Sequence, residues 1–346
     1  MEQIMVLILA AGEGKRMKSK YSKVVHEACG KPIIKWVCNA AKEAGIKETT
    51  VIIGHQAEQV KECLGEEYNY VYQYQQLGTG HAVMQAENIL NRRDGLVFIL
   101  YGDTPLVTGE TISKAINYHK TQGYVATVLT AEVKNPTGYG RIIRDSNGNV
   151  RKIVEHRDAS PEELKIKEIN SGMYCFSIKH LLLALKDLKN NNNQGEYYLT
   201  DTLEILINNG FKVGAYIVDD PEEILGVNDR MQLYQVSEIL RRRICIKHMK
   251  EGVTIIDPSN TYIDSEVKIG IDTIIYPGVI LEGNTVIGEE CIIGPNSRII
   301  DSNIGNNVQI QNSVIVSSTI GDGANIGPFA YIRPESIIGE NVKVGD

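Results

Sequence analysis

The fold of the C-terminal part of this chain is decided by residues 263–299, which read IDSEVK-IGIDTI-IYPGVI-LEGNTV-IGEECI-IGPNSR-I. An aliphatic residue opens each block, at intervals of six. After a step of five the series continues with Ile304, Ile310 and Val316, and after a step of four with Ile320, Ile326, Ile332, Ile338 and Val344. A period of six fits neither an α-helix nor a meander. It is typical of a parallel β-helix, in which each aliphatic side chain points into the prism and Gly or another small residue turns the corner.

The repeats run to Val344-Gly345-Asp346, where the sequence stops within a repeat. A solenoid needs a polar cap, because an open end exposes the surface on which the next coil would stack. We therefore expect this chain to be a fragment of a longer protein, or to be capped by a partner chain.

Upstream of the repeats, apolar runs alternate with amphipathic stretches as far as about Val227. The runs that predict strands are Met5–Leu9, Thr50–Ile53, Leu96–Tyr101, Val125–Ala131 and Val213–Val218. Helical periodicity predicts helices over Pro32–Gly45, Ala57–Leu64, Gly80–Leu90 and Glu110–Thr121. Because the strands are apolar on both faces, the alternation indicates an α/β domain with a doubly wound, Rossmann-like parallel sheet.

Two further segments complete the predicted organisation. The run Asp145-Ser146-Asn147-Gly148 predicts a hairpin, since Asn-Gly is a strong turn signal, and with it an antiparallel lobe near residues 137–175. Asp229–Lys250 has the pattern of one helix, with Arg241–Arg243 on its solvated face. We expect a first domain over 1–228, a linker helix over 229–251 and a left-handed parallel β-helix over 252–346.

Composition excludes several classes of protein. The 346 residues carry 36 basic and 43 acidic side chains, a formal charge of -7, which argues against a nucleic-acid or anionic-membrane surface. The six cysteines form no C-x-x-C pair, so a zinc site or a disulfide framework is not expected. Neither a signal peptide nor a membrane-spanning run is visible, and a cytoplasmic location is therefore expected.

The first predicted strand leads directly into Leu9-Ala10-Ala11-Gly12-Glu13-Gly14-Lys15-Arg16-Met17. Glycines after a strand let backbone N–H groups approach phosphate oxygens. The dinucleotide fingerprint fails, because Met17 stands where its third Gly should be, and the P-loop fails, because Arg16 follows Lys15. Taken alone, the loop is compatible with a nucleotide cradle and equally with a plain tight turn.

Three other features could complete a phosphate site. Lys23 could bring an ammonium to the loop, although it could also be an ordinary surface lysine. In Leu77–Ala82 two glycines flank Thr79, a pattern that lets the backbone read a flat base; His81 there is expected to cap or pack rather than to catalyse. Asp103 ends an apolar strand, where a carboxylate favours Mg²⁺, the alternative being a cap of the turn before Pro105.

Together these motifs resemble the sugar-1-phosphate nucleotidyltransferases. The segments that carry the resemblance, in chain order, are Leu9–Gly12, Lys23, Leu77–Ala82, Tyr101–Asp103, Pro136–Arg141, Ile153–His156, Ile169–Gly172 and Gly226–Asn228. Followed by hexapeptide repeats, they are similar in particular to the bifunctional N-acetylglucosamine-1-phosphate uridyltransferase/glucosamine-1-phosphate acetyltransferases. The resemblance covers essentially the whole chain.

The resemblance implies an Mg²⁺-dependent enzyme that transfers UMP from UTP to N-acetylglucosamine 1-phosphate and yields UDP-N-acetylglucosamine and pyrophosphate. It implies catalytic roles for Arg16, Lys23 and Asp103, and metal ligation by Asp103 and Asn228. The substrate-binding residues that it implies are Leu9, Ala10, Ala11, Gly12, Gly14, Lys23, Gln73, Gly78, Thr79, Tyr101, Gly102, Asp103, Gly140, Glu155, Asn170 and Asn228. In particular, Gln73, Gly78 and Thr79 should read uracil, and Tyr101, Gly140, Glu155 and Asn170 should line the sugar pocket.

For the repeat region the resemblance implies a trimeric acetyltransferase that uses acetyl-CoA, with Arg333 holding the phosphate of glucosamine 1-phosphate. The family's catalytic histidine and CoA-binding residues lie beyond Asp346. We therefore expect the chain as given to lack acetyltransferase activity and its repeats to serve as a trimerisation stem.

Two other functions remain open. The first is a pyrophosphorylase for another nucleotide or another sugar 1-phosphate, such as glucose 1-phosphate. The second is a non-catalytic regulatory subunit that only binds sugar nucleotides. The presence of Lys23, Asp103 and the Gly-rich loop argues against the second.

Overall fold

The computed structural model describes residues 3–345. The chain folds into two compact units. The first comprises the residues before Glu27 together with Pro32–Leu233, and the second comprises Glu27–Lys31 and the residues from Tyr234 onward. The division therefore falls inside helix α8 (Arg230–Lys250), between the predicted limits at residues 228 and 252.

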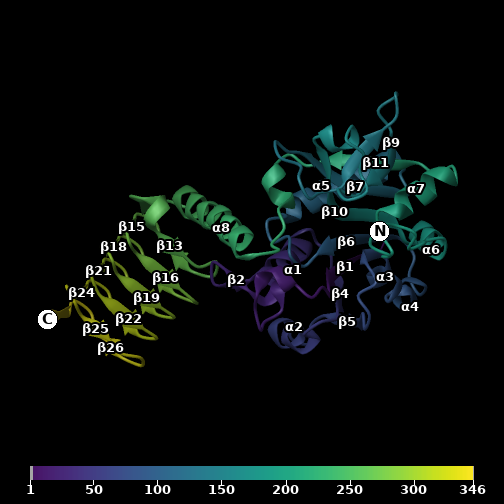
Figure 1. Ribbon diagram of the computed structural model, residues 1–346. Helices are drawn as coiled ribbons and strands as arrows, with labels where there is room; N and C mark the ends of the chain where they lie inside the picture. The colour runs from purple at the N-terminus through teal and green to yellow at the C-terminus, as the bar shows by residue number, and fades with distance from the viewer. Residues whose placement is uncertain (1–2, 346) are drawn as a thin grey trace. The chain divides into compact units, whose positions relative to one another are not determined.

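A nine-stranded mixed sheet forms the centre of the first unit, with the main order β11-β7-β10-β6-β1-β4-β5 (Figure 1). Its strands are β1 (Ile4–Ala10), β4 (Glu48–Ile53), β5 (Asn69–Tyr72), β6 (Leu96–Tyr101), β7 (Ala126–Glu132), β8 (Arg141–Arg144), β9 (Val150–Val154), β10 (Glu168–Ser177) and β11 (Val213–Ile217). Strands β6, β1, β4 and β5 run parallel, whereas β10 is antiparallel to both β6 and β7. A separate small sheet pairs β2 (Glu27–Ala28) with β3 (Lys31–Pro32).

Helices follow the strands as the alternation predicted. They are α1 (Ile33–Glu43), α2 (Ala57–Leu64), α3 (Thr79–Met84), α4 (Glu87–Leu90), α5 (Gly109–Gln122), α6 (Ile178–Lys186) and α7 (Asp201–Asn208). Short 3-10 turns are η1 (Lys15–Met17), η2 (Lys23–Val25), η3 (Glu163–Lys165) and η4 (Pro221–Ile224). The helix predicted over Gly80–Leu90 is two short helices, separated at Gln85–Ala86.

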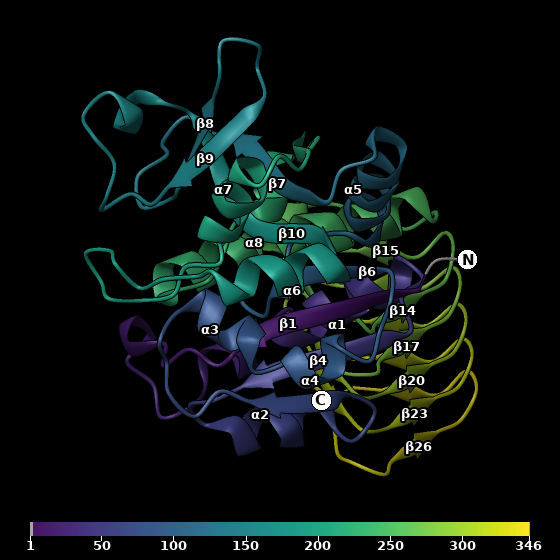
Figure 2. The ribbon, with the colours of Figure 1, turned by 90° about the vertical axis from the view of Figure 1, so that its right-hand side faces the viewer.

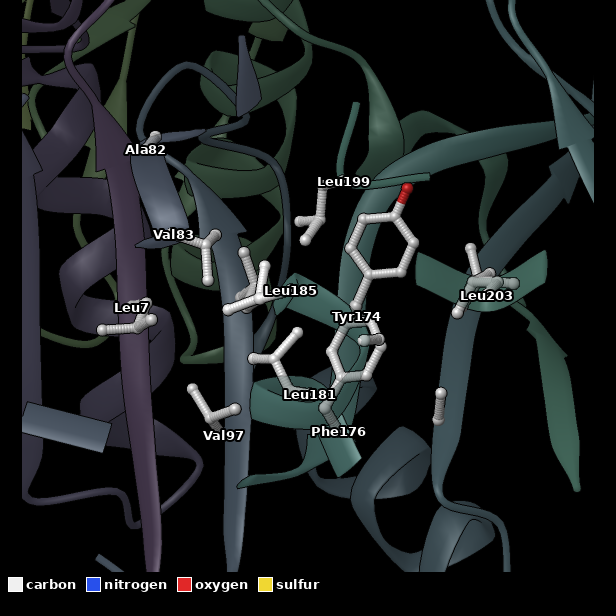
Figure 3. Packing of buried hydrophobic residues seen from close by; sticks show 14 of the residues in the cluster. Leu7, Ala82, Val83, Val97, Tyr174, Phe176, Leu181, Leu185, Leu199 and Leu203 are labelled. Carbon is white, nitrogen blue, oxygen red and sulfur yellow. The ribbon is translucent and has the colours of Figure 1, made fainter. Parts of the chain in front are cut away.

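Both faces of the sheet are covered by apolar side chains. In β1, Met5, Leu7 and Leu9 pack into a cluster with α3, α4, α6 and α7, while the alternate residues Val6 and Ile8 are equally buried on the other face. Figure 3 shows the aromatic side chains of β10 beside the leucines of α6 in this cluster. Each such buried side chain contributes about 1.5–3 kcal/mol. The doubly wound, Rossmann-like prediction is confirmed.

The antiparallel lobe predicted near residues 137–175 is present as the hairpin β8–β9 and strand β10. Its turn is wider than a two-residue Asn-Gly turn, because the N–H of Asp145 donates to the carbonyl of Asn149 at 2.9 Å. The carboxylate of Asp145 also accepts from the N–H groups of Asn147 and Asn149, both at 2.9 Å. An Asx-type loop therefore closes the hairpin.

The second unit is a parallel β-helix of short strands in three sheets (Figure 2). The first sheet contains β12 (Thr254–Ile255), β15 (Ile274–Ile275), β18 (Ile292–Ile293), β21 (Gln309–Ile310), β24 (Asn325–Ile326) and β27 (Lys343–Val344). The second contains β13 (Tyr262–Ile263), β16 (Ile280–Glu282), β19 (Arg298–Ile300), β22 (Val314–Val316) and β25 (Tyr331–Ile332). The third contains β14 (Lys268–Ile269), β17 (Val286–Ile287), β20 (Asn303–Ile304), β23 (Thr319–Ile320) and β26 (Ile337–Ile338), and η5 (Pro258–Asn260) lies between β12 and β13. This architecture agrees with the predicted left-handed parallel β-helix.

One position of the predicted repeat is wrong. Ile315 is fully buried and aligned with Ile299 and Ile332, whereas Val316 is only half-buried. The series thus takes two steps of five here, because stacked coils require their inward residues to be aligned. The corner glycines are needed for the same stacking: a Cβ on Gly288 would lie 2.6 Å from the carbonyl oxygen of Gly305 in the next coil.

The remaining structural expectations concern cysteines and membranes. The cysteines Cys38, Cys175, Cys245 and Cys291 are buried, and Cys29 and Cys63 are partly buried. Within residues 3–345, no helix combines the length and the apolar character needed to cross a bilayer.

Candidate active site

A pocket with a cavity volume of about 320 Å³ lies in the first unit, at the carboxyl ends of β1 and β6. This is the edge at which open α/β sheets bind ligands. Eleven of the predicted residues line it: Leu9, Ala10, Ala11, Gly12, Lys23, Gln73, Gly78, Thr79, Tyr101, Asp103 and Asn228. The parallel pairing of β1 with both β4 and β6 brings these distant segments together.

Lys23, Asp103 and Asn228 meet on one side of this pocket. The ammonium of Lys23 donates to Oδ2 of Asp103 and to Oδ1 of Asn228, the latter at 3.1 Å. The Lys23 and Asp103 side chains are 14% and 15% exposed, so the ion pair is shielded from water more than a surface pair. The resemblance alone suggested Asn228, and the fold places its amide oxygen on the same ammonium as the Asp103 carboxylate.

The turn at Gly78 and Thr79, predicted to contact a base, is held by its neighbours. Gln73 is buried, and its amide nitrogen donates to the carbonyl of Gly78 at 3.1 Å and lies 3.1 Å from Nδ1 of His81. Gly78 has φ 108°, and a Cβ there would approach the carbonyl oxygen of Tyr197 to 2.5 Å. Only glycine therefore fits this position. The ring of His81 contacts Gln73, and its structural rather than catalytic role stays a prediction.

Thr79 connects the turn to the wall of the pocket. Its Oγ1 accepts from the backbone N–H of Leu199 at 3.1 Å, and its hydroxyl is hydrogen-bonded to that of Tyr101. Burial, followed by the charge of Glu155, raises the pKa of Tyr101, so the phenol stays neutral.

The other predicted sugar residues form a second group. The N–H of Asn170 donates to the carbonyl of Gly140 at 2.9 Å, and a Cβ on Gly140 would lie 3.4 Å from Oε1 of Glu155. Oδ1 of Asn170 accepts from the N–H of Gly172 at 2.9 Å. The ring of Tyr101 packs on Gly172, where an added Cβ would lie 2.7 Å from Cε2. Tyr101 thus joins this group to the pocket, although Gly140, Glu155 and Asn170 do not line the pocket itself.

Glu155 also borders a cavity of about 510 Å³. Its acidic lining residues are Glu155, Asp158, Asp201 and Glu204. Burial, followed by the charges of Asp201 and Asp158, raises the pKa of Glu155. Burial, followed by Glu204 and Asp158, raises the pKa of Asp201 to about 6. These carboxyl groups therefore hold their protons to higher pH than exposed carboxyl groups do.

The other predicted residues lie outside the 320 Å³ pocket. Gly14 and Arg16 belong to the turn around η1, where the Arg16 side chain is exposed. Gly102 is buried behind the pocket, and its N–H donates to the carbonyl of Leu9 at 2.9 Å. Arg333 is exposed between β25 and β26 of the second unit.

Several pocket residues had not been predicted. They are Val24, Gln76, Ala82 and Glu196. Val24 and Gln76 adjoin predicted motifs, but Glu196 belongs to a loop without a recognisable pattern, which reaches the pocket because the N–H of Tyr197 donates to the carbonyl of Leu77 at 2.8 Å. Arg141 lies outside this pocket and had no predicted role: it is 1% exposed, and its guanidinium donates to the carbonyl of Tyr139 beside Gly140.

Two known families match parts of this chain. Residues 5–221 match the family described as nucleotidyl transferase, and residues 254–346 match the family described as GMPPB C-terminal domain. The first match runs from β1 to the start of η4 and includes every residue given above for the pocket except Asn228, and the second covers the coils of the β-helix.

Similar whole proteins are also known. The bifunctional protein GlmU of Acetivibrio thermocellus is 60% identical over 346 residues, which are 100% of this chain and 75% of that protein. The bifunctional GlmU proteins of Caldanaerobacter subterraneus subsp. tengcongensis and Clostridioides difficile are 59% and 54% identical over 98% of this chain and 74% of each relative. The chain therefore belongs to the GlmU family of bifunctional nucleotidyl transferases.

Proposed function

We propose that the pocket of the first unit binds UTP and N-acetylglucosamine 1-phosphate and forms UDP-N-acetylglucosamine and pyrophosphate, with Mg²⁺ held by Asp103 and Asn228. Membership of the GlmU family makes the chain an enzyme of UDP-N-acetylglucosamine synthesis. The observation that carries the residue assignment is the convergence of Lys23, Asp103 and Asn228 next to the Gly-rich turn after β1.

The donor set fits Mg²⁺. The Asp103 carboxylate and the Asn228 amide oxygen already converge on one cation, the ammonium of Lys23. Among residues 3–345 there is no group of three His, Cys, Asp or Glu side chains that could hold a metal. Mg²⁺ commonly takes only one or two protein oxygens and completes its shell with water and substrate phosphates. When bound, it neutralises charge on the triphosphate and orients it.

The remaining residues position the two anionic substrates. Backbone N–H groups of the turn from Ala11 to Gly14 are proposed to hold phosphate oxygens, and Arg16 and Lys23 to add positive charge. Gln73, Gly78 and Thr79 are proposed to contact uracil, and Glu155 with Asn170 to contact sugar hydroxyl groups. The sugar phosphate is already ionised near neutral pH, so its oxygen attacks the α-phosphorus in line without a general base, and positioning with charge stabilisation supplies the catalysis.

The test is an assay of pyrophosphate release with UTP, N-acetylglucosamine 1-phosphate and Mg²⁺. Parallel reactions contain ATP, GTP or dTTP in place of UTP, and glucose 1-phosphate in place of the amino sugar. We expect release with the first pair and little with the others. Preference for another pair would assign the chain to a different pyrophosphorylase, and no release by the folded protein would favour a non-catalytic binding role.

The second unit is proposed as a stem that joins three copies of the chain. Outward-facing side chains on one sheet of the prism include the exposed Tyr262, Val314 and Tyr331. Light scattering of the purified chain tests this proposal: the mass of three chains is expected, and a monomer would contradict it.

A further inference from the structure

Lys23 occupies the place between two oxygens that the proposed function gives to a metal ion. Its ammonium donates to the Asp103 carboxylate and to the Asn228 amide oxygen, which are 80 and 205 residues away in sequence. Both oxygens thus face one position, and in this structure a side chain of the protein itself supplies the cation there.

The backbone segments that carry these two oxygens are held in place independently of Lys23. The N–H of Val227 donates to the backbone carbonyl of Asp103 at 2.8 Å, which ties the two segments together. The N–H of Asn228 donates to Oε1 of Gln232 at 2.8 Å. If the lysine contacts are lost, these backbone contacts remain, so the Asp103 carboxylate and the Asn228 amide oxygen stay on neighbouring segments and can act together as hard oxygen ligands.

An ammonium and Mg²⁺ cannot occupy this position together. Mg²⁺ binds oxygens at about 2.0–2.1 Å, so it would stand within a few ångström of the present Nζ. Two like charges at such a distance in a shielded site repel strongly. Metal binding therefore requires Nζ to leave, while the base of the side chain stays against the loop, where a Cβ on Gly14 would lie 2.8 Å from Cβ of Lys23. The flexible four-carbon stem lets Nζ reach toward that loop.

We propose that Lys23 is a stand-in cation: it compensates Asp103 while the metal is absent, and the arriving metal displaces its ammonium toward the phosphates of the nucleotide. This inference rests on the proposed function, because it takes Asp103 and Asn228 as the metal ligands. Lys23 then contacts Asp103 before the metal binds and the nucleotide phosphates afterwards. Until the nucleotide is bound, the lysine competes with the metal for Asp103.

The test measures binding of Mn²⁺ alone, without nucleotide, by the enhancement of water-proton relaxation. Wild type is compared with Lys23→Met, which keeps an unbranched side chain and removes the charge. If the ammonium occupies the position in about nine of ten molecules, the apparent Kd of the wild type is about tenfold above the intrinsic one. We therefore expect Lys23→Met to bind Mn²⁺ about tenfold more tightly than wild type, while its nucleotidyl transfer falls.

Two controls separate the possible outcomes. Lys212→Met removes the same charge from an exposed lysine whose ammonium lies 5.8 Å from the centre of the Tyr124 ring, and its Mn²⁺ affinity should equal that of wild type. Asp103→Asn should lose Mn²⁺ binding. If it does, but Lys23→Met binds Mn²⁺ no more tightly than wild type, the stand-in role is wrong and the proposed function stands.

Mn²⁺ binding that survives Asp103→Asn overturns the metal assignment and the stand-in role together. Circular dichroism verifies that each variant is folded. Should Lys23→Met not fold, Lys23→Ala is measured in its place, with the same two outcomes deciding.

Discussion

The pocket at Asp103 and the cavity at Glu155 belong to the same unit, but their acidic groups are compensated differently. In the pocket the carboxylate of Asp103 is bonded to an ammonium, that of Lys23. The cavity is lined by Glu155, Asp158, Asp201 and Glu204, and Lys152 is the cation among its described lining residues. Burial and mutual repulsion raise the pKa values of Glu155 and Asp201.

The contrast indicates two tasks. Charges that are paired and fixed suit the handling of phosphates and a metal, since the protein can exchange one cation for another there. Carboxyl groups that hold their protons to higher pH can both donate and accept hydrogen bonds, which suits a ligand rich in hydroxyl groups. Tyr101 is hydrogen-bonded to Thr79 and packs on Gly172, so it lies between the residues proposed for the base and those proposed for the sugar.

The largest expected effect is on nucleotidyl transfer, and it concerns Asp103, whose carboxylate is paired with Lys23. Asp103→Ala should lower nucleotidyl transfer by about 10²–10³, the usual cost of removing one preorganised electrostatic group. Pyrophosphate release at saturating UTP and sugar phosphate measures this. Lys212→Met, remote from the pocket, should retain wild-type turnover. Wild-type turnover by folded Asp103→Ala would show that the ion pair at Asp103 has no part in the reaction, and the proposed difference between the pocket and the acidic cavity would be lost.

A smaller effect is expected in the acidic cavity. Glu155→Gln should raise the KM for N-acetylglucosamine 1-phosphate by about tenfold or more, because a hydrogen bond to a charged group contributes about 1.5–3 kcal/mol. The KM for UTP should stay the same, since Glu155 does not line the pocket that holds Gln73 and Thr79. A change confined to the KM for UTP would contradict the assignment of this region to the sugar.

The smallest effect concerns stability and pH. The pKa of Asp201 is raised from 3.8 to about 6, first by burial and then by Glu204 and Asp158, so the folded chain keeps a proton that the unfolded chain releases. The unfolded state binds fewer protons between about pH 4 and 6, and the free energy of unfolding therefore falls as the pH rises through this window. Asp201→Asn should avoid this loss.

Thermal unfolding checks this last expectation. Asp201→Asn should raise Tm by about 1–3 °C at pH 7.5 and leave it unchanged near pH 4; the gain is kept small because Asp201 is partly solvent-accessible and its charge is screened. A gain at pH 4 equal to that at pH 7.5 would show that packing, not ionisation, is responsible.

Local patterns in the sequence were sufficient to predict much of the architecture. The period of six predicted the β-helix, and the alternation of apolar runs predicted the covered sheet, because periodicity reflects which side of an element is buried. Strand β6 was predicted with its observed ends, Leu96 and Tyr101. Patterns also have limits. From Ile310 to Ile320, the sequence allows either Ile315 or Val316 as the inward residue, because both are aliphatic. Only the alignment with the neighbouring coil selects Ile315, which pairs with Ile299.

For the site, the sequence by itself determined the residue types: a Gly-rich turn after β1, a carboxylate after β6 and a lysine between them in the chain. Only the tertiary structure decided that Lys23 bonds both Asp103 and Asn228, that Arg16 lies outside the pocket and that the Glu196 loop reaches it. The physical reason is that the order of strands β6, β1 and β4 and the loop contacts across them depend on pairings between distant segments, which no local pattern encodes.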